Sequence, residues 1–142
     1  MARRIVVGTG YLGLRVARLW QQQGDEVYGV TRTPAKAGTL AELGLKPIIA
    51  DVLNPPTLAE IPHCDTLVYS VGPGGHSQVS RLALYRDGLK TVLDRWGHCA
   101  DRIVLVSSTG VYGNSSSEVI DESVPRRPLR EASQALAEAE DI

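Results

Sequence analysis

The chain has 142 residues, of which 43% are apolar, 22% are charged and only 5% are aromatic. This length fits one domain, and the composition is that of an ordered protein with an aliphatic core. The formal net charge of −1 provides no positive field for nucleic acid, which argues against a nucleic-acid-binding role.

The first third of the chain alternates short β-branched runs with stretches whose apolar residues recur three or four apart. The first pattern is typical of buried parallel strands, and the second of helices that bury one face. Glycines at 24 and 44 mark the ends of the two helices, and the proline at 34 suits a helix start. In chain order we predict a strand at Arg4–Val7, a helix over 12–23, a strand at Glu26–Thr31, a helix over 34–43 and a strand at Pro47–Ala50.

The rest of the chain continues this alternation with longer irregular segments between the elements. The connector from Pro55 to Pro62 is rich in proline, and no regular structure is predicted for it. The polar segment from Ser107 to Pro128 is predicted to be a loop. The remaining predicted elements are a strand at Thr66–Val71, a long amphipathic helix over 79–96, a strand at Ile103–Val106 and an alanine-rich helix at Glu131–Glu140.

Strands that alternate with helices at this spacing predict parallel βαβ units with right-handed crossovers. The expected fold is therefore α/β, a Rossmann-type doubly wound parallel sheet in a three-layer α/β/α arrangement with strand order 3-2-1-4-5. Residues 1–142 are expected to form this single domain.

Cysteine use and the amino terminus bear on the compartment. Only Cys64 and Cys99 are present, which indicates a reducing compartment, and the cytoplasm is expected. The apolar run that follows the basic start ends at Gly8 and is too short for a signal peptide or a membrane span. The histidine–cysteine pairs at 63–64 and 98–99 match no zinc-binding spacing, so no metal site is predicted.

The first predicted strand leads directly into a G-x-G-x-x-G pattern that precedes a helix. In such a turn Gly8 permits the tight reversal, Gly10 lets the backbone approach a diphosphate, and Gly13 lets helix and strand pack closely. The N–H groups and partial positive charge of the helix start favour the phosphates. An ordinary glycine-rich turn is the alternative, but the place of the loop in the first of several βαβ units favours dinucleotide binding. The predicted cofactor contacts in this loop are Gly8, Thr9, Gly10, Tyr11, Leu12 and Gly13.

The end of the second strand bears on which cofactor is bound. NAD-binding domains of this kind have an acidic residue there, which accepts hydrogen bonds from ribose hydroxyls, whereas this chain has Arg32. A guanidinium suits a 2′-phosphate, so NADP(H) is expected over NAD(H); a solvated surface arginine is the alternative. Asp51 is expected to meet the adenine amino group or to form a turn. Val71 and Gly72 are further expected contacts, since the glycine-rich run at 72–75 lets the backbone approach the cofactor, or simply forms a turn.

The segment at 104–113, Val-Leu-Val-Ser-Ser-Thr-Gly-Val-Tyr-Gly, is followed by Asp-Glu at 121–122 and Pro-Arg-Arg-Pro at 125–128. Together with the glycine loop, Arg32, Asp51 and the Asp-Gly-Leu stretch at 87–89, it resembles the extended short-chain dehydrogenases/reductases of the NAD-dependent epimerase/dehydratase type. The resemblance extends over nearly the whole chain. It implies an NAD(P)-binding oxidoreductase or a sugar-nucleotide epimerase-like domain.

In that family the serine or threonine four places before the motif's tyrosine hydrogen-bonds the reacting carbonyl or hydroxyl, and the resemblance gives this role to Ser108. Thr109 is the second candidate, and Tyr112 is implied to line the substrate pocket. A hydroxyl at the carboxyl end of a parallel strand lies where cofactor and substrate meet. The alternative roles are hydrogen bonding to the backbone for Ser107 and Ser108, and packing of the loop for Tyr112.

The family's general acid–base, a tyrosine followed four residues later by a lysine, has no counterpart here. Alignment of the last predicted helix places Arg130 at the tyrosine and Gln134 at the lysine, and neither side chain exchanges a proton in proteins. This departure resembles the atypical subgroup of the family, which keeps the cofactor fold but lacks the usual tyrosine. The implied binding residues therefore transfer better than the implied chemistry.

Members of the family continue beyond this helix, so the chain is expected to lack their C-terminal substrate region. The fifth strand would then be an open edge, or would be covered by association into a homo-oligomer. The expected substrate is a small-molecule carbonyl or a nucleotide sugar, with no nucleic-acid or membrane partner. Arg126, Arg127 and Arg130 are candidates to meet a sugar-nucleotide phosphate, or form a solvated face.

Two functions follow from these patterns. The first is an NADP(H)-linked oxidoreductase or epimerase-type domain that uses Ser108 to polarise a carbonyl. The second is a non-catalytic, dinucleotide-sensing regulatory module. The serine motif favours the first, because a sensor has no need of it.

Overall fold

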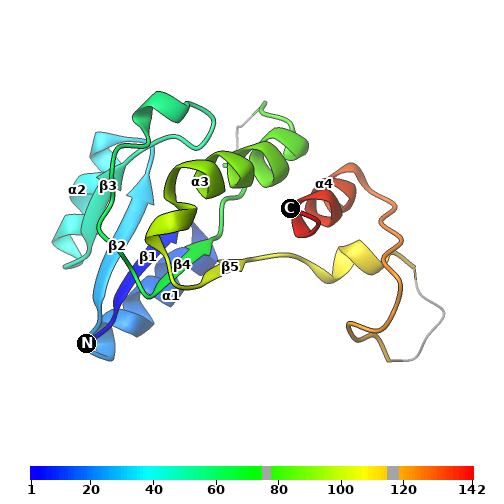
Figure 1. Ribbon diagram of the computed structural model, residues 1–142, viewed down its shortest axis with the longest axis horizontal. Coiled ribbons are helices and arrows are strands. Elements are labelled where there is room, and N and C mark those ends of the chain that lie inside the picture. Colours follow the sequence, from blue (N-terminus) through cyan, green and yellow to red (C-terminus); the bar gives the residue numbers. More distant parts are fainter. Residues whose placement is uncertain (75–77, 115–118) are drawn as a thin grey trace.

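A computed structural model describes residues 1–74, 78–114 and 119–142; Gly75, the last residue of the glycine-rich run, lies outside these ranges. Five parallel strands form one sheet in the order β3-β2-β1-β4-β5, as predicted (Figure 1). The strands are β1 (Arg3–Val7), β2 (Glu26–Thr31), β3 (Lys46–Ile49), β4 (Thr66–Tyr69) and β5 (Ile103–Leu105).

Helices cover both faces of the sheet and complete the three layers (Figure 1). On one face Val6 packs with Ala17 of α1 and Leu40 of α2. On the other face Ile5 packs with Trp96 of α3, and α4 lies beside this layer. Within the described residues no helix is both long and apolar enough to cross a membrane. The helices are α1 (Tyr11–Gln22), α2 (Pro34–Glu42), α3 (Gly88–Trp96) and α4 (Glu131–Glu140).

Three strands end earlier than the sequence predicts, and one of them is β3, which ends at Ile49 instead of Ala50. β4 stops at Tyr69 instead of Val71, because its neighbour β1 ends at Val7 and turns away at Gly8. A last ladder bond joins the Ser70 N–H to the Val7 carbonyl at 2.8 Å, and beyond it no partner strand remains. β5 is one residue shorter than predicted, and it forms the edge of the sheet, as expected.

The long helix predicted over 79–96 is interrupted. Helical residues begin at Arg81, and Ala83–Asp87 form a π-helical segment before α3. Segments predicted to be irregular also contain single 3-10 turns. These are η1 (Pro55–Thr57), η3 (Gly97–Cys99) and η4 (Thr109–Tyr112).

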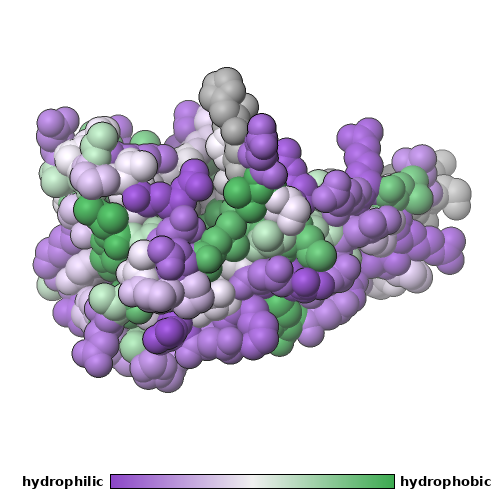
Figure 2. Space-filling view, turned by 90° about the horizontal axis from the view of Figure 1, so that it is seen from above, coloured by the Kyte–Doolittle hydropathy of each residue, from purple (hydrophilic) through white to green (hydrophobic). Residues whose placement is uncertain are grey.

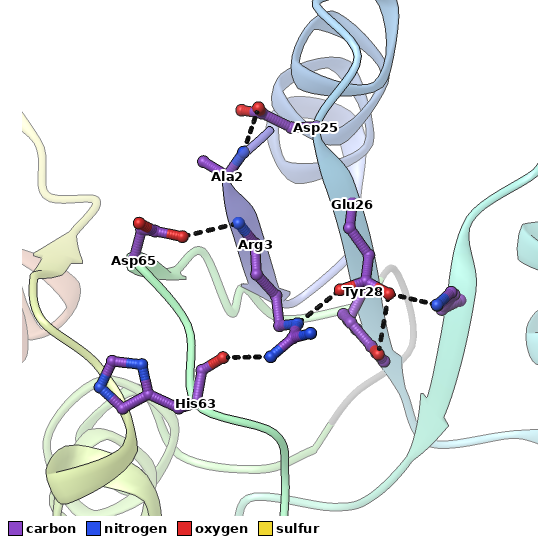
Figure 3. A network of polar contacts seen from close by, with 8 residues as sticks. Ala2, Arg3, Asp25, Glu26, Tyr28, His63 and Asp65 are labelled. Carbon is purple, nitrogen blue, oxygen red and sulfur yellow. Dashed lines mark hydrogen bonds and ion pairs between the residues drawn. The ribbon is translucent and has the colours of Figure 1, made fainter.

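A polar network joins the amino ends of the strands (Figure 3). The Arg3 guanidinium and the Lys46 ammonium both pair with Glu26, which links β1, β2 and β3. The Arg3 N–H donates to Asp65 at 2.7 Å, and Asp25 pairs with Arg4 at 2.9 Å. These ion pairs link the strands at their amino ends, opposite the carboxyl ends of the sheet.

Candidate functional site

A cleft of about 490 Å³ runs across the carboxyl ends of the strands. In open α/β sheets ligands bind at this end, where successive crossovers leave to opposite faces. Figure 2 looks onto this end and shows apolar patches set among hydrophilic side chains. The volume is in the range of small-molecule pockets, roughly 300 to 1,000 Å³. The predicted cofactor contacts that line the cleft are Gly8, Thr9, Gly10, Tyr11, Leu12, Arg32, Asp51, Val71 and Gly72.

Two close backbone contacts hold the glycine loop. Gly8 has a φ of +95°, and a Cβ at this position would lie 2.6 Å from the carbonyl oxygen of Ser70. At Gly13 a Cβ would overlap the carbonyl oxygen of Gly8. Glycine is therefore required at both places, by the positive φ at the first and by steric contact at the second. Gly13 itself does not line the cleft but brings the start of α1 against the end of β1.

The loop presents bare backbone to the cleft. A Cβ at Gly10 would have no atom within 4 Å, and Gly10 begins α1 without a side-chain cap. No acidic residue lies in the first turn of α1, so its N–H groups and partial positive charge face the cleft without competition. Thr9 is 3% exposed, with its hydroxyl 3.5 Å from the Val30 carbonyl oxygen, so the cleft meets only its backbone. This arrangement suits an anion such as a diphosphate.

Arg32 and Asp51 also line the cleft. Arg32 follows β2, and Asp51 follows β3. The Arg32 guanidinium extends toward the loop that follows β4, with Nη2 4.0 Å from the place where a Cβ of Gly74 would lie. Asp51 Oδ1 accepts the Leu53 N–H at 2.9 Å, so this carboxylate does form the turn that was its alternative role. Because Asp51 also lines the cleft, its second oxygen remains placed to accept a ligand hydrogen bond.

The π-helical segment brings two side chains to the cleft wall, Leu84 and Tyr85. The Gly88 N–H reaches back five residues to the Ala83 carbonyl, and a Cβ on Gly88 would overlap the Tyr69 hydroxyl. That hydroxyl donates to the Leu84 carbonyl at 2.6 Å. Burial raises the pKa of Tyr69 far above its usual value, which keeps this phenol protonated as a donor. Close packing of glycine on tyrosine thus sets the position of the segment.

Ser107 and Ser108 follow β5 and both line the cleft. Ser108 Oγ accepts the Gly110 N–H at 3.1 Å, which is the backbone role considered above, and its hydroxyl has no acceptor among the described residues. Ser107 donates to Glu140 at 2.5 Å. Thr109 and Tyr112, the other two candidates for catalysis, belong to η4 and do not line the cleft.

Residues 8–142 match the family described as NAD(P)H-binding. The chain belongs to this NAD(P)H-binding family. The predicted relation to the extended short-chain dehydrogenases/reductases of the NAD-dependent epimerase/dehydratase type is also confirmed. No curated protein matches the chain.

Solved structures agree with this family assignment. A protein from Methylobacillus flagellatus assigned as an NAD-dependent epimerase/dehydratase is 33% identical over 99% of the chain and 49% of its own, with a TM-score of 0.75. Two others share the fold. ADP-L-glycero-D-manno-heptose-6-epimerase of Helicobacter pylori is 16% identical over 99% of the chain and 49% of its own, with a TM-score of 0.80. UDP-glucuronic acid 4-epimerase of Bacillus cereus is 20% identical over 98% of the chain and 50% of its own, with a TM-score of 0.75. The NAD(P)H-binding chain spans about half the length of these relatives.

The family's tyrosine and lysine positions fall at the start of α4 in the NAD(P)H-binding domain. Arg130 directly precedes α4 and Gln134 lies within it; both are exposed and neither lines the cleft. Leu136 is the residue of α4 that reaches the cleft. No titratable side chain of this helix therefore lines the cofactor cleft.

Arg126 is exposed, as the solvated-face alternative expects, and its guanidinium is bonded to α4. Its guanidinium donates to the Ala137 carbonyl at 2.9 Å and to Glu140 at 3.0 Å, and it pairs with Asp141 at 2.5 Å. These bonds attach the end of α4 to the preceding loop. The arginine is therefore a structural anchor, because its donors are occupied by the helix.

Sequence reasoning missed several residues of the cleft. Lys36 lies four residues after Arg32, a short separation in sequence that could have drawn attention to it. Tyr85 was not singled out from the sequence. For Ser70 and Leu136 the sequence offers no signal. All four line the cleft. Within the described ranges no three histidine, cysteine or acidic side chains gather as a metal site would require.

Proposed function

We propose that the chain is the cofactor-binding part of an NADP(H)-linked oxidoreductase or sugar-nucleotide epimerase with an atypical active site. One arrangement supports this proposal above others. An uncapped helix start beneath the bare backbone of Gly10 faces a cleft that also contains an arginine after β2. NAD(P)H binding follows from the family, and the preference for the phosphorylated cofactor is the finer claim.

Different residues of the cleft contact different parts of the cofactor. The first turn of α1 faces the diphosphate, and Gly10 allows it to approach the backbone. Arg32 meets the 2′-phosphate with its planar donors, and Asp51 accepts from the adenine amino group. Val71 and Gly72 offer backbone to the rest of the cofactor.

When bound, the nicotinamide supplies or accepts a hydride. The hydroxyl of Ser108 donates a hydrogen bond to the oxygen of the reacting carbonyl and so stabilises the negative charge that develops there. Thr109 and Tyr112 are secondary candidates. Both follow the end of β5, but neither lines the cleft. The substrate class is a small carbonyl compound or a nucleotide sugar. The Bacillus cereus relative, solved with UDP-glucuronic acid and NAD, supports the second.

A dinucleotide-sensing regulatory module is the second candidate function. The exposed Arg130 and Gln134, which replace the family's tyrosine and lysine, favour it because neither can transfer a proton. The two functions differ in a simple assay. An enzyme changes the absorbance of the reduced nicotinamide with at least one member of a panel of carbonyls and sugar nucleotides. A sensor leaves it constant and instead changes its affinity for a partner when NADPH is added.

Calorimetric titration with NADPH and NADH tests the cofactor assignment on the parent chain, on Arg32→Ala and on Arg95→Ala. Arg95 is an exposed arginine of α3 outside the cleft lining, so its removal controls for net charge. We expect the parent to bind NADPH more tightly than NADH. Arg32→Ala should weaken NADPH binding about tenfold, as the loss of one charge-assisted contact implies, and NADH binding much less. Equal affinity of the parent for both nucleotides would overturn the NADP assignment.

A further inference from the structure

The two sides of the cleft differ in their titratable side chains. The side that follows β2 and β3 contains Arg32, Lys36 and Asp51. The other side follows β4 and β5 and includes part of the π-helical segment and one residue of α4. Its described lining consists of residues 70–74, 84, 85, 106–108 and 136. Among these described residues, Tyr85 is the one with a titratable side chain.

The local structure gives Tyr85 a defined place on the cleft wall. It lies in the middle of the π-helical segment Ala83–Asp87, next to α4 (Figure 1). Single π-helical turns are rare and occur frequently at functional sites. The contact of Gly88 with the Tyr69 hydroxyl fixes the segment, as described above. Tyr85 is half-buried and packs against the core, so its ring is held while part of the side chain borders the cleft.

The Tyr85 hydroxyl makes no hydrogen bond with any residue that the structure describes. Two other tyrosines differ in this respect, since the Tyr69 hydroxyl donates to the Leu84 carbonyl and the Tyr28 hydroxyl donates to Glu26. The Ser108 hydroxyl, on the same side of the cleft, also lacks an acceptor among the described residues. A substrate oxygen on this side would therefore find two hydroxyl groups with no other acceptor.

Tyrosine is one of the side chains that transfer protons in enzymes, because its hydroxyl both donates and accepts. No titratable side chain of α4 lines the cleft, so the group expected from the family at this helix is replaced by none of its described residues. A proton donor from another element is needed if the cleft reduces a carbonyl. On the β4–β5 side of the described cleft, Tyr85 has the chemistry for this role.

We infer that Tyr85 transfers a proton to or from the substrate oxygen, in place of the tyrosine whose position Arg130 takes. This inference rests on the proposed function, because it requires the nicotinamide to lie on the β4–β5 side. In carbonyl reduction the carbonyl carbon accepts a hydride from the reduced nicotinamide, and the C=O π electron pair moves to the oxygen. This oxygen takes the proton of the Tyr85 hydroxyl, and water returns a proton to the phenolate. The products are an alcohol and the oxidised nicotinamide.

The first test locates Tyr85 relative to the nicotinamide without measuring activity. N-acetylimidazole acetylates accessible phenols, and peptide mass spectrometry reports the rate at each tyrosine. We expect saturating NADPH to slow acetylation of Tyr85 about tenfold, since a cleft ligand covers most of the surface that it meets. Adenosine 2′,5′-bisphosphate, which lacks the nicotinamide, should leave this rate unchanged. Tyr28 belongs to the polar network at the amino ends of the strands and is the internal control (Figure 3).

The second test compares Tyr85→Phe, which keeps the ring and removes the hydroxyl, with Tyr28→Phe as the matched control. The parent and both variants are assayed with NADPH and a panel of carbonyl compounds and sugar nucleotides. We expect Tyr85→Phe to lower kcat about 100-fold or more, as the loss of a general acid does, with KM and the Kd of NADPH nearly unchanged. Tyr28→Phe should match the parent in all three quantities.

The outcomes separate this inference from the proposed function. If NADPH leaves acetylation of Tyr85 unchanged, or if Tyr85→Phe keeps the turnover of the parent, only the inference is wrong. An equal loss of kcat and of NADPH binding in Tyr85→Phe would also refute it, because such a loss indicates a structural role. If the parent turns over no member of the panel, the proposed oxidoreductase function fails and the inference falls with it.

Discussion

Alanine substitution at Gly10 and at Gly13 separates binding from stability within one loop. A Cβ at Gly10 meets no atom within 4 Å and the backbone there is extended, so Gly10→Ala should change the free energy of unfolding by less than about 0.5 kcal/mol. The same methyl group stands where the diphosphate approaches the backbone. Loss of one backbone hydrogen bond to a charged group, about 1.5 to 3 kcal/mol, predicts roughly 10- to 150-fold weaker dinucleotide binding.

Gly13→Ala should do the reverse. Its Cβ would overlap the Gly8 carbonyl oxygen and lie 3.1 Å from Val6 Cγ1, so α1 must shift against β1. Overpacking of this kind costs about 1 to 3 kcal/mol. For a chain of this size that corresponds to a fall in Tm of roughly 4 to 10 °C. Thermal unfolding monitored by circular dichroism and calorimetric titration with NADPH measure both quantities on both variants. A large fall in Tm for Gly10→Ala, or parent-like NADPH affinity in that variant, would refute the reasoning.

Two further predictions concern stability. Tyr69→Phe removes the 2.6 Å bond that the buried hydroxyl donates to the Leu84 carbonyl; urea denaturation should show a loss of about 1 kcal/mol, and none for Tyr112→Phe as the control. Hydrogen bonds from Lys46 and Arg3 lower the pKa of Glu26 from 4.5 to about 2. The stability that this carboxylate provides is complete above its unfolded pKa and is lost as the pH falls toward about 2. The Tm should therefore fall more steeply between pH 5 and pH 2.5 in the parent than in a Glu26→Gln variant, and identical slopes would contradict this assignment.

The fold was predictable where a pattern covered a whole element. Short apolar runs between helical stretches located all five strands, because buried parallel strands leave a continuous apolar signature. The π-helical segment at Ala83–Asp87 was not predictable, since one extra residue in a turn hardly alters apolar spacing over 79–96. The length of β4 was also missed. Its end depends on where the neighbouring β1 turns away, which is a property of the sheet and not of residues 66–71.

The candidate site was also predictable only in part. The glycine loop was predictable because its residues are contiguous and each has a steric reason. The bonds that position α4 were not, since Ser107 and Arg126 meet Glu140 across a long polar loop without any local signal. The displacement of Thr109 and Tyr112 from the cleft has a similar cause. A 3-10 turn that Ser108 caps carries both away from the lining.

The tight fit between Gly8, Gly13 and Ser70 has an evolutionary consequence. Because backbone contacts leave no room for a side chain at Gly8 or Gly13, these two positions have little freedom to change. Arg32, which follows β2 and also lines the cleft, has an exposed side chain instead. If Arg32 selects the phosphorylated cofactor as proposed, a few substitutions among such exposed residues would change the cofactor preference and leave the scaffold unchanged.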